Sequence, residues 1–229
     1  MNDTCVLRLR DVAKVFGQGE GLARVLDGVG LELGQGEVVA VMGPSGSGKT
    51  TLLTIAGALQ RPTSGTVEVA GREIQALPQS ELASVRRQAV GFIFQGFNLL
   101  QALNARENVE YGLELAGHRG AHAHARAMHL LSMVGIEHRS EALPKLLSGG
   151  EQQRVSIARA LAGNRSVLLA DEPTASLDEK RATEVIGLLR AVSRDMGVGV
   201  LMVTHDLRVR DKADRVLWLE GGRLGAAGQ

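Results

Sequence analysis

Aromatic residues are scarce in this chain of 229 residues, at 3%. Unpaired nucleic-acid bases bind to proteins largely by stacking on aromatic rings, so this scarcity argues against a single-strand-binding protein. An excess of charge is also missing, since 26 Lys and Arg residues stand against 25 Asp and Glu residues, a formal net charge of +1. Because a basic surface is what holds DNA or RNA, we expect no nucleic-acid partner.

Cysteine and long apolar runs are also few. The one cysteine, Cys5, cannot form a disulfide within the chain, and the first residues contain no apolar signal segment. Both observations favour a reducing compartment, and we expect the cytoplasm. The apolar runs at residues 38–42 and 198–203 are far shorter than the roughly 20 residues of a membrane-spanning helix. We therefore expect no direct insertion into a membrane.

Hydrophobic residues, at 44%, are plentiful enough for one compact domain over residues 1–229. Near the start of the chain, residues 7–12 and 29–33 alternate apolar with polar side chains, and glycines bound residues 65–71. These patterns predict half-buried antiparallel strands. In contrast, residues 38–42, 167–170 and 200–203 are continuous apolar runs, which predict central parallel strands that neighbour one another in a sheet.

Helical periodicity occurs between the apolar runs, and alternation of strands with helices indicates an α/β sheet. No strand pattern is found between about residues 96 and 159, so we expect a helical lobe at residues 96–158, inserted into an α/β core of residues 1–95 and 159–229. The predicted helices are residues 50–59, 126–134, 151–162 and 183–195.

A glycine-rich segment, GPSGSGKT, follows the first apolar run and precedes a predicted helix. This is the pattern and the context of a P-loop, whose backbone N–H groups surround phosphates. Lys49 is expected to reach the β- and γ-phosphates, Thr50 to place its hydroxyl on Mg²⁺, and Thr51 to assist at the α-phosphate. A glycine-rich turn without a ligand is the alternative. The remaining expected ligand-binding residues of the loop are Gly43, Pro44, Ser45, Gly46, Ser47 and Gly48.

Two acidic residues, Asp171 and Glu172, end the apolar run at residues 167–170. A buried strand that ends in a carboxylate brings negative charge beside the phosphate loop. We expect Asp171 to help hold Mg²⁺ and Glu172 to act as the general base toward the attacking water. The alternative is an ordinary acidic cap at the start of a helix.

A third segment, LSGGEQQR at residues 147–154, resembles the signature of ATP-binding cassette (ABC) ATPases. The resemblance covers essentially the whole chain and implies a RecA-like P-loop NTPase core with an antiparallel β subdomain and an inserted helical subdomain. Gln95 is similar to the glutamine that reaches Mg²⁺ or the lytic water, and His205 to the histidine that bonds the γ-phosphate. Phe16 resembles the aromatic that stacks on adenine; a core phenylalanine is the alternative.

The signature makes a second anion site, because Ser148, Gly149 and Gly150 precede a predicted helix. In the family such a site contacts the γ-phosphate held by the other subunit. The resemblance therefore implies a homodimer around two ATP molecules, with Asp178 at the interface between the two subunits. The alternative for this segment is an ordinary helix N-cap, with an acidic residue in the first turn of the helix and no bound ligand. Glu151 replaces the glutamine that is commoner there, and we expect its negative charge to oppose closure of the dimer.

Residues 91–100 and 103–109 resemble the macrolide-exporter and lipoprotein-release branch, and residues 109–114 resemble heterocyst-type glycolipid exporters. Members of this branch act with an integral-membrane permease, which implies a peripheral position on the inner face of the membrane. A soluble ABC ATPase in a non-transport complex and a P-loop kinase are the alternatives. The sequence does not identify a cargo. Four histidines at positions 118, 122, 124 and 129 lack further ligands, and we expect no metal there.

Overall fold

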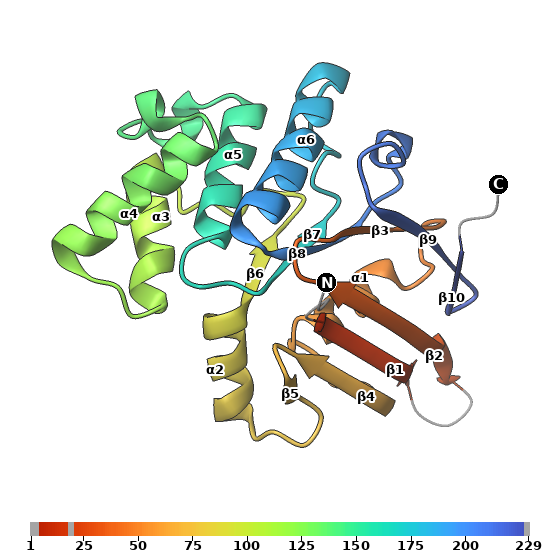
Figure 1. The fold of residues 1–229 in the computed structure, drawn as a ribbon. Helices are drawn as coiled ribbons and strands as arrows, with labels where there is room; N and C mark the ends of the chain where they lie inside the picture. The colour runs from red at the N-terminus through yellow and green to blue at the C-terminus, as the bar shows by residue number, and fades with distance from the viewer. Residues whose placement is uncertain (1–4, 18–20, 227–229) are drawn as a thin grey trace.

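The computed structural model describes residues 5–17 and 21–226, which form two sheets and a group of helices. One sheet is antiparallel, with the strand order β2-β1-β4-β5, and the other has the order β10-β9-β3-β8-β7-β6. Figure 1 shows the antiparallel sheet at the lower right and the helices α3, α4 and α5 at the left. The strands are β1 (Cys5–Phe16), β2 (Ala23–Gly34), β3 (Val38–Met42), β4 (Ser64–Val69), β5 (Arg72–Glu73), β6 (Val90–Ile93), β7 (Val167–Asp171), β8 (Gly199–Val203), β9 (Arg215–Glu220) and β10 (Arg223–Ala226).

The three continuous apolar runs are neighbouring parallel strands, as the sequence predicts. In the six-stranded sheet, β8 lies between β3 and β7, and every residue of β3 and β8 is buried. Successive residues of β3 face opposite sides. Val39 and Val41 pack in the cluster that contains the antiparallel sheet and α1, whereas Ala40 and Met42 pack in the cluster of the helices. Both faces of the sheet are therefore covered, which is why these strands show no alternation.

The three alternating segments near the start of the chain lie in the antiparallel sheet, which confirms that prediction. The strands β5, β6, β9 and β10 were not predicted. β5 has two residues and β6 has four, one of them glycine, while β9 and β10 begin with arginine and have few buried side chains, so their sequences give only a weak strand signal.

Helices occur where the periodicity predicts them, and two more are present. All strands in the described residues lie outside residues 96–159, so this segment is helical as expected, whereas the boundary at residue 158 falls inside α5 and stays a prediction. The helices are α1 (Lys49–Ala56), α2 (Gln79–Ala89), α3 (Ala105–Leu115), α4 (Gly120–Met133), α5 (Gly149–Ala160) and α6 (Glu179–Met196).

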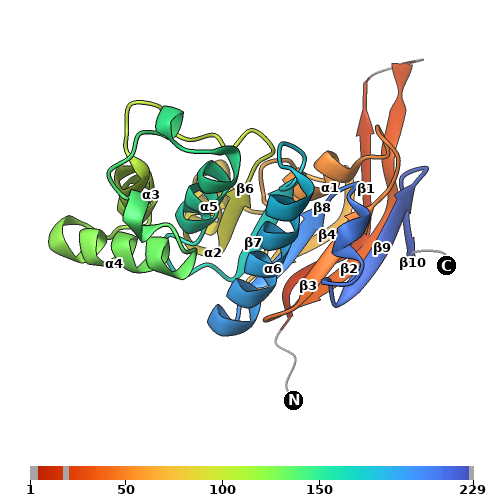
Figure 2. The ribbon, with the colours of Figure 1, turned by 90° about the horizontal axis from the view of Figure 1, so that it is seen from above.

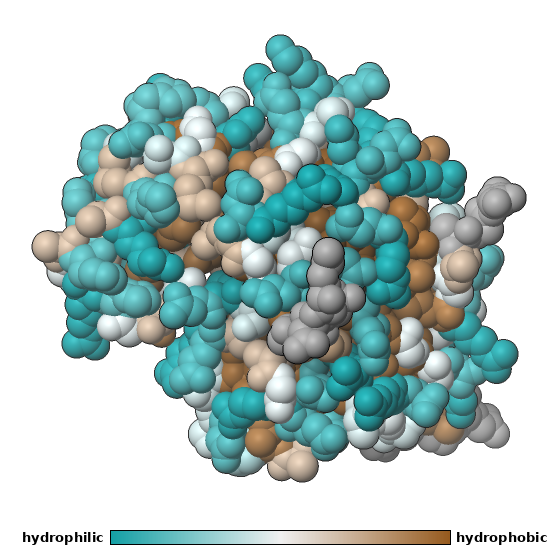
Figure 3. Space-filling model, in the orientation of Figure 1, coloured by the Kyte–Doolittle hydropathy of each residue, from teal (hydrophilic) through white to brown (hydrophobic). Residues whose placement is uncertain are grey.

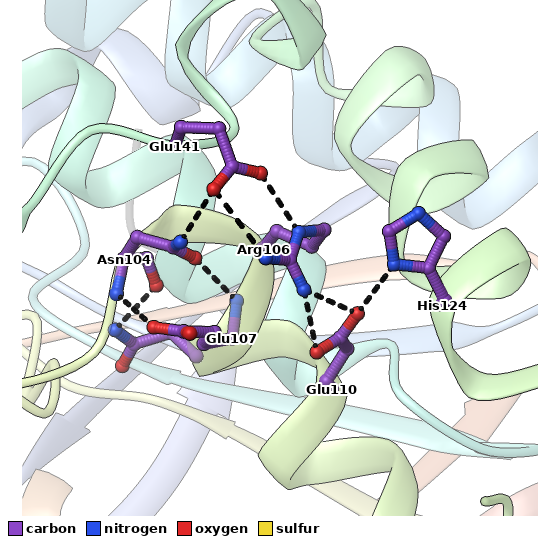
Figure 4. A network of polar contacts seen from close by, with 7 residues as sticks. Asn104, Arg106, Glu107, Glu110, His124 and Glu141 are labelled. Carbon is purple, nitrogen blue, oxygen red and sulfur yellow. Dashed lines mark hydrogen bonds and ion pairs between the residues drawn. The ribbon is translucent and has the colours of Figure 1, made fainter. Parts of the chain in front are cut away.

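A polar network fastens α3 to α4 and to the segment that precedes α5 (Figure 4). The Arg106 guanidinium binds both carboxylate oxygens of Glu110 at 2.8 and 2.9 Å, and its Nε donates to Glu141 at 2.9 Å. His124 Nδ1 of α4 lies 3.0 Å from Glu110 Oε1. Asn104 caps α3 and also donates to Glu141. The helical lobe is thereby held as a unit by charge-assisted bonds as well as by its apolar core.

Hydrophilic side chains cover most of the face seen in Figure 3, and the hydrophobic areas on it are small and separate. Over residues 5–17 and 21–226, every helix is too short or too polar to span a lipid bilayer. The rings of His118 and His122 stack 5.4 Å apart on the helical lobe. Within the same residues, there is no group of three or more His, Cys, Asp or Glu side chains that could hold a metal ion.

Candidate functional site

The phosphate loop joins the end of β3 to the start of α1, and its glycines have backbone conformations that side chains disfavour. Gly46 and Gly48 have φ values of 77° and 100°. A Cβ atom on Gly48 would lie 2.8 Å from the carbonyl oxygen of Val25, and one on Gly43 would lie 2.1 Å from that of Leu219. Glycine is thus required here for both conformation and space.

The loop presents backbone donors at the start of a helix. In the described residues, the N–H groups of Gly46, Gly48 and Lys49 donate to no protein acceptor, whereas Ser47 N–H donates to the Pro44 carbonyl at 3.3 Å. The Ser47 hydroxyl is buried and also has no partner in that part of the chain. Free N–H groups at a helix N-terminus attract anions through their partial positive charge. The loop therefore fits a phosphate group.

The Lys49 ammonium lies over the same loop. It donates to the carbonyl oxygens of Gly43 at 2.9 Å and Pro44 at 2.8 Å. Neither acceptor is charged, so the ammonium keeps its positive charge available to an anion at the loop.

In the parallel register, the carboxyl ends of β3, β8 and β7 lie side by side at one edge of the sheet. Val203 of β8 pairs with Val41 of β3 and with Asp171 of β7. The Thr50 hydroxyl lies 3.4 Å from Asp171 Oδ1, and burial raises the pKa of the Asp171 carboxyl. A half-buried carboxylate beside a hydroxyl provides the oxygen ligands that Mg²⁺ prefers, so these residues fit such an ion.

Glu172 lies in a strained conformation immediately after β7. Its φ of 47° is in the left-handed region, which is uncommon for a residue other than glycine. Its Oε2 accepts from the Thr204 hydroxyl at 2.9 Å, and His205 Nδ1 lies 2.9 Å from its Oε1. The side chain of Glu172 is 16% exposed and that of His205 is 73% exposed. His205 is therefore not a buried structural histidine, and it lies against the carboxylate at the opening of the site.

Thr204 belongs to a set of polar residues behind Glu172 that the sequence analysis did not identify. Its buried hydroxyl also accepts from the Asp206 N–H at 3.0 Å. Asp206 in turn accepts from the Thr174 hydroxyl and from Arg208. Burial opposes ionisation of Asp206, but its bonds to Arg208 prevail and lower its pKa. The position of Thr204, directly before His205 at the end of a buried strand, is the sequence signal that could have identified it.

These residues surround a pocket of about 640 Å³, a volume typical of small-molecule sites. The lining includes most of the expected loop residues together with Gln95, Asp171, Glu172 and His205. Val25 is an addition that the sequence analysis missed, and Pro44 and Ser47 do not line the pocket. The lining residues are Val25, Gly43, Ser45, Gly46, Gly48, Lys49, Thr50, Thr51, Gln95, Asp171, Glu172 and His205.

Phe16 ends β1 outside this pocket lining. Its side chain is not part of the core, because the residue is 40% exposed, and Lys14 Nζ lies 5.0 Å from the centre of its ring. The alternative of a core phenylalanine is therefore wrong. An exposed ring with a cation over one face is free to stack on a planar group.

The signature segment also lies outside the pocket and begins α5. The Ser148 hydroxyl accepts from the Glu151 N–H at 3.4 Å, and Glu151 Oε2 accepts from the Ser148 N–H at 2.7 Å. This capping box lowers the pKa of Glu151, and Arg139 lies 3.5 Å from the same carboxylate. The Glu151 carboxylate is thus bonded to the cap of its own helix and lies close to Arg139 of the same chain.

The glycine after Ser148 is not required by packing. A Cβ atom on Gly149 would meet its nearest neighbour, Leu177, at an ordinary 3.5 Å, while one on Gly150 would lie 3.0 Å from Arg181. Asp178, predicted to line a seam, caps α6 by accepting from the Arg181 N–H at 3.0 Å, and this bond lowers its pKa. The structure thus keeps Ser148, Gly149, Gly150 and Asp178 apart from the pocket in a single chain.

Comparison with known proteins gives one family. The family model described as "ABC transporter" matches residues 26–175. The macrolide export ATP-binding/permease protein MacB of Marinobacter nauticus is 46% identical over 224 residues, which are 98% of this chain and 35% of that protein. MacB 1/2 of Paracoccus denitrificans is 47% identical over 221 residues, 96% of this chain and 33% of that protein. The chain spans about a third of the length of these curated relatives.

A solved structure is similar over nearly its full length. It is the dimeric, post-hydrolysis ATP-binding cassette MJ0796 bound to ADP and Pi, with a TM-score of 0.85 and 39% identity, covering 97% of this chain and 99% of that chain. This likeness confirms the predicted fold class, a RecA-like P-loop core with an antiparallel β subdomain and an inserted helical subdomain.

The role of Thr204 can be tested by Thr204→Val, which removes the hydroxyl and keeps the size. A hydrogen bond to a charged group contributes about 1.5–3 kcal/mol, so we expect the free energy of unfolding to fall by that amount. Urea denaturation followed by circular dichroism measures it. Thr204→Ser should restore most of the loss, and Thr183→Val on the exposed face of α6 is the control. If Thr204→Val and Thr183→Val lowered the free energy of unfolding equally, the hydrogen bond from Thr204 to Glu172 would not be important for stability.

Proposed function

The chain belongs to the ABC transporter family, and we propose that it is the ATP-hydrolysing subunit of a transporter of the macrolide-exporter type. The observation that carries this proposal is the pocket in which a phosphate loop faces Asp171, Glu172 and His205. A loop alone would only bind phosphate, and the carboxylate and imidazole opposite to it supply the means to cleave it. Because the chain matches only about a third of its curated relatives, the activity of a whole exporter belongs to this proposal.

Binding of the triphosphate rests on positive charge and on N–H groups. The free N–H groups of the loop and the Lys49 ammonium surround the β- and γ-phosphates, and Thr51 lies at the α-phosphate. Thr50, Gln95 and Asp171 would hold Mg²⁺, which neutralises phosphate charge when bound. The exposed ring of Phe16 is the proposed stacking partner of adenine.

Hydrolysis requires a base that is held in place. Thr204 fixes Oε2 of Glu172, and His205 contacts Oε1, so the carboxylate has a defined orientation at the pocket wall. Glu172 takes a proton from the attacking water, whose oxygen forms the new bond to the γ-phosphorus while the bond to the β–γ bridging oxygen breaks. His205 bonds the γ-phosphate and orients Glu172 or the water. ADP and inorganic phosphate are the products.

We propose that each ATP is shared by two copies of the chain. Ser148, Gly149 and Gly150 begin a helix of 12 residues but lie outside the pocket of their own chain. Glycine at position 149 leaves the helix end open to an approaching phosphate, although packing within the chain does not require it. These residues therefore suit the γ-phosphate held by a second copy, with Asp178 at the seam. Arg139, 3.5 Å from the Glu151 carboxylate, offsets part of the expected repulsion.

A partner in the membrane is the second part of the proposal. Leu100, Tyr111 and Leu115 are exposed apolar residues, 40%, 44% and 54% exposed, around a groove of about 270 Å³ between β6 and α3. Exposed apolar side chains gathered at a groove mark a protein interface. The groove borders the segment that follows Gln95, so a permease seated there would contact the segment that leads to the pocket. The chain would then lie on the cytoplasmic face of the membrane, held by the permease.

The nucleotide site is tested first by Lys49→Ala. Loss of charge-assisted bonds to two phosphates should weaken ATP binding by about 100-fold, measured by isothermal titration calorimetry. The exposed Lys212→Ala is the control and should bind ATP like the wild type. The wild type should release phosphate from ATP without an added acceptor, which a small-molecule kinase would not do. Unchanged affinity in Lys49→Ala would remove this residue from the site.

The shared site is tested by Glu172→Gln. Loss of the base should lower phosphate release by about 10²–10⁴-fold while the binding contacts remain, so the ATP-bound dimer should accumulate in size-exclusion chromatography. Adding Gly149→Asp, whose Cβ atom would meet its nearest neighbour at an ordinary 3.5 Å and whose charge repels phosphate, should return the protein to a monomer. Gly187→Ala, in the open middle of α6, is the matched control for that addition. A persistent monomer with ATP would overturn the shared site.

The membrane partner is tested by tagging the chain and purifying it from a detergent extract of its own cells. An integral-membrane protein should copurify, and the double substitution Tyr111→Asp with Leu115→Asp should lose it because two charges are placed in an apolar interface. ATP affinity should remain unchanged. The exposed Leu22→Asp is the control. Equal recovery with the double variant would show that the partner binds elsewhere.

A further inference from the structure

A second cavity, of about 700 Å³, lies at the end of the sheet opposite to the nucleotide pocket. Ser166 precedes β7, and Gly197 and Val198 precede β8, so the same two strands run from this cavity to Asp171 and His205. Figure 2 shows α6 ending at the edge of the molecule away from α1. The cavity lining includes Arg126, Asn164, Arg165 and Ser166.

The charge of this cavity has one sign. Arg126 and Arg165 line it, and no Asp or Glu is found among its described lining residues. Neither arginine forms an ion pair within residues 5–17 and 21–226, whereas Arg8 and Arg106 each pair with two carboxylates. Arg165 also donates to the backbone carbonyls of the neighbouring Arg86 and Arg87. A chain with almost no net charge thus concentrates uncompensated positive charge at this end.

The two guanidinium groups are also incompletely bonded. The Nε atoms of Arg126 and Arg165 are buried without an acceptor in the described part of the chain. Burial lowers the pKa of Arg165, which reflects the cost of removing its charge from water. A partly buried cation with no carboxylate nearby is unfavourable, and an anion in the adjoining cavity would offset that cost.

The rest of the lining indicates what kind of anion fits. Asn164 lies beside the Arg126 guanidinium, since its Oδ1 is 3.5 Å from Arg126 Nη2. Asn164 and Ser166 are uncharged polar residues of the same lining. Val6, Ala70, Met196 and Val198 provide an apolar wall, so the cavity suits an anionic group attached to a less polar body. A guanidinium group favours phosphate, which it binds through parallel N–H donors, and two such groups line this cavity.

We propose that this cavity binds a phosphate-bearing small molecule, with Arg126 and Arg165 as the source of positive charge for its phosphate, at a site separate from the nucleotide pocket. The ligand source is either a free phosphorylated metabolite or the headgroup of an anionic phospholipid. The site does not depend on the proposed ATPase function, because it shares no lining residue with the nucleotide pocket.

The test uses the full chain carrying Lys49→Ala, so that the phosphate loop is weakened as a competing site. Two probes are titrated, inorganic pyrophosphate by calorimetry and phosphatidylglycerol vesicles by sedimentation, with phosphatidylcholine vesicles as the blank. We expect one of the probes to bind and Arg126→Gln with Arg165→Gln to weaken it by about tenfold or more. Binding of pyrophosphate assigns a soluble ligand, and binding of the vesicles alone assigns a lipid headgroup.

Arg165→Lys, which keeps a positive charge, should bind the probe more tightly than Arg165→Gln does. Arg126→Gln alone, with Arg165 intact, should also weaken binding of the probe. The exposed Arg10→Gln removes the same charge elsewhere and should leave binding unchanged. Failure of both probes to bind overturns the proposal. Binding that the arginine substitutions leave unchanged also overturns it, because pyrophosphate then occupies the phosphate loop or another surface.

Discussion

The functional site depends on the parallel pairing of three buried strands. Val203 of β8 stands opposite Val41 of β3 and Asp171 of β7, so the phosphate loop, the carboxylates and His205 emerge side by side at one edge of the sheet. A slip of a single residue would turn the inward side chains of one strand to the other face. Such a slip would place side chains of different size in each of the two packed cores, which close packing opposes. The same packing that stabilises the domain therefore sets the geometry of the pocket.

At this edge of the sheet, positively and negatively charged groups face each other across the pocket. The loop and Lys49 provide positive charge and free N–H groups, while Asp171 and Glu172 provide negative charge a few ångströms away. Burial raises the pKa of Asp171, and Glu172 is held by Thr204 and His205 in a conformation of positive φ. Such strain is maintained only where the surrounding bonds compensate for it, and the set formed by Thr174, Thr204, Asp206 and Arg208 provides that support.

The two ends of the sheet are lined by different side chains. At the carboxyl end of β7 and β8 lies the pocket of the phosphate loop, and at their amino end lies the cavity with Arg126 and Arg165. The signature belongs to neither, because Ser148 begins a helix of the inserted lobe. Its capping box uses the Ser148 hydroxyl and the Glu151 carboxylate within the chain, yet leaves Gly149 uncrowded. The phosphate loop and the signature are thus two helix N-termini that a single copy of the chain does not bring together.

The sequence by itself determined the strands that are buried on both faces, the helices with clear periodicity, the phosphate loop and the acidic pair, because apolar runs and glycine spacing are local properties. It did not reveal the short or polar-ended strands β5, β6, β9 and β10, whose pairing depends on distant partners. Only the tertiary structure placed Val25 in the pocket, set Thr204 behind Glu172, exposed the ring of Phe16 and tied Glu151 to its own cap. It also gathered Arg126 and Arg165 around one cavity, since contacts between residues far apart in the chain are decided by packing and not by local pattern.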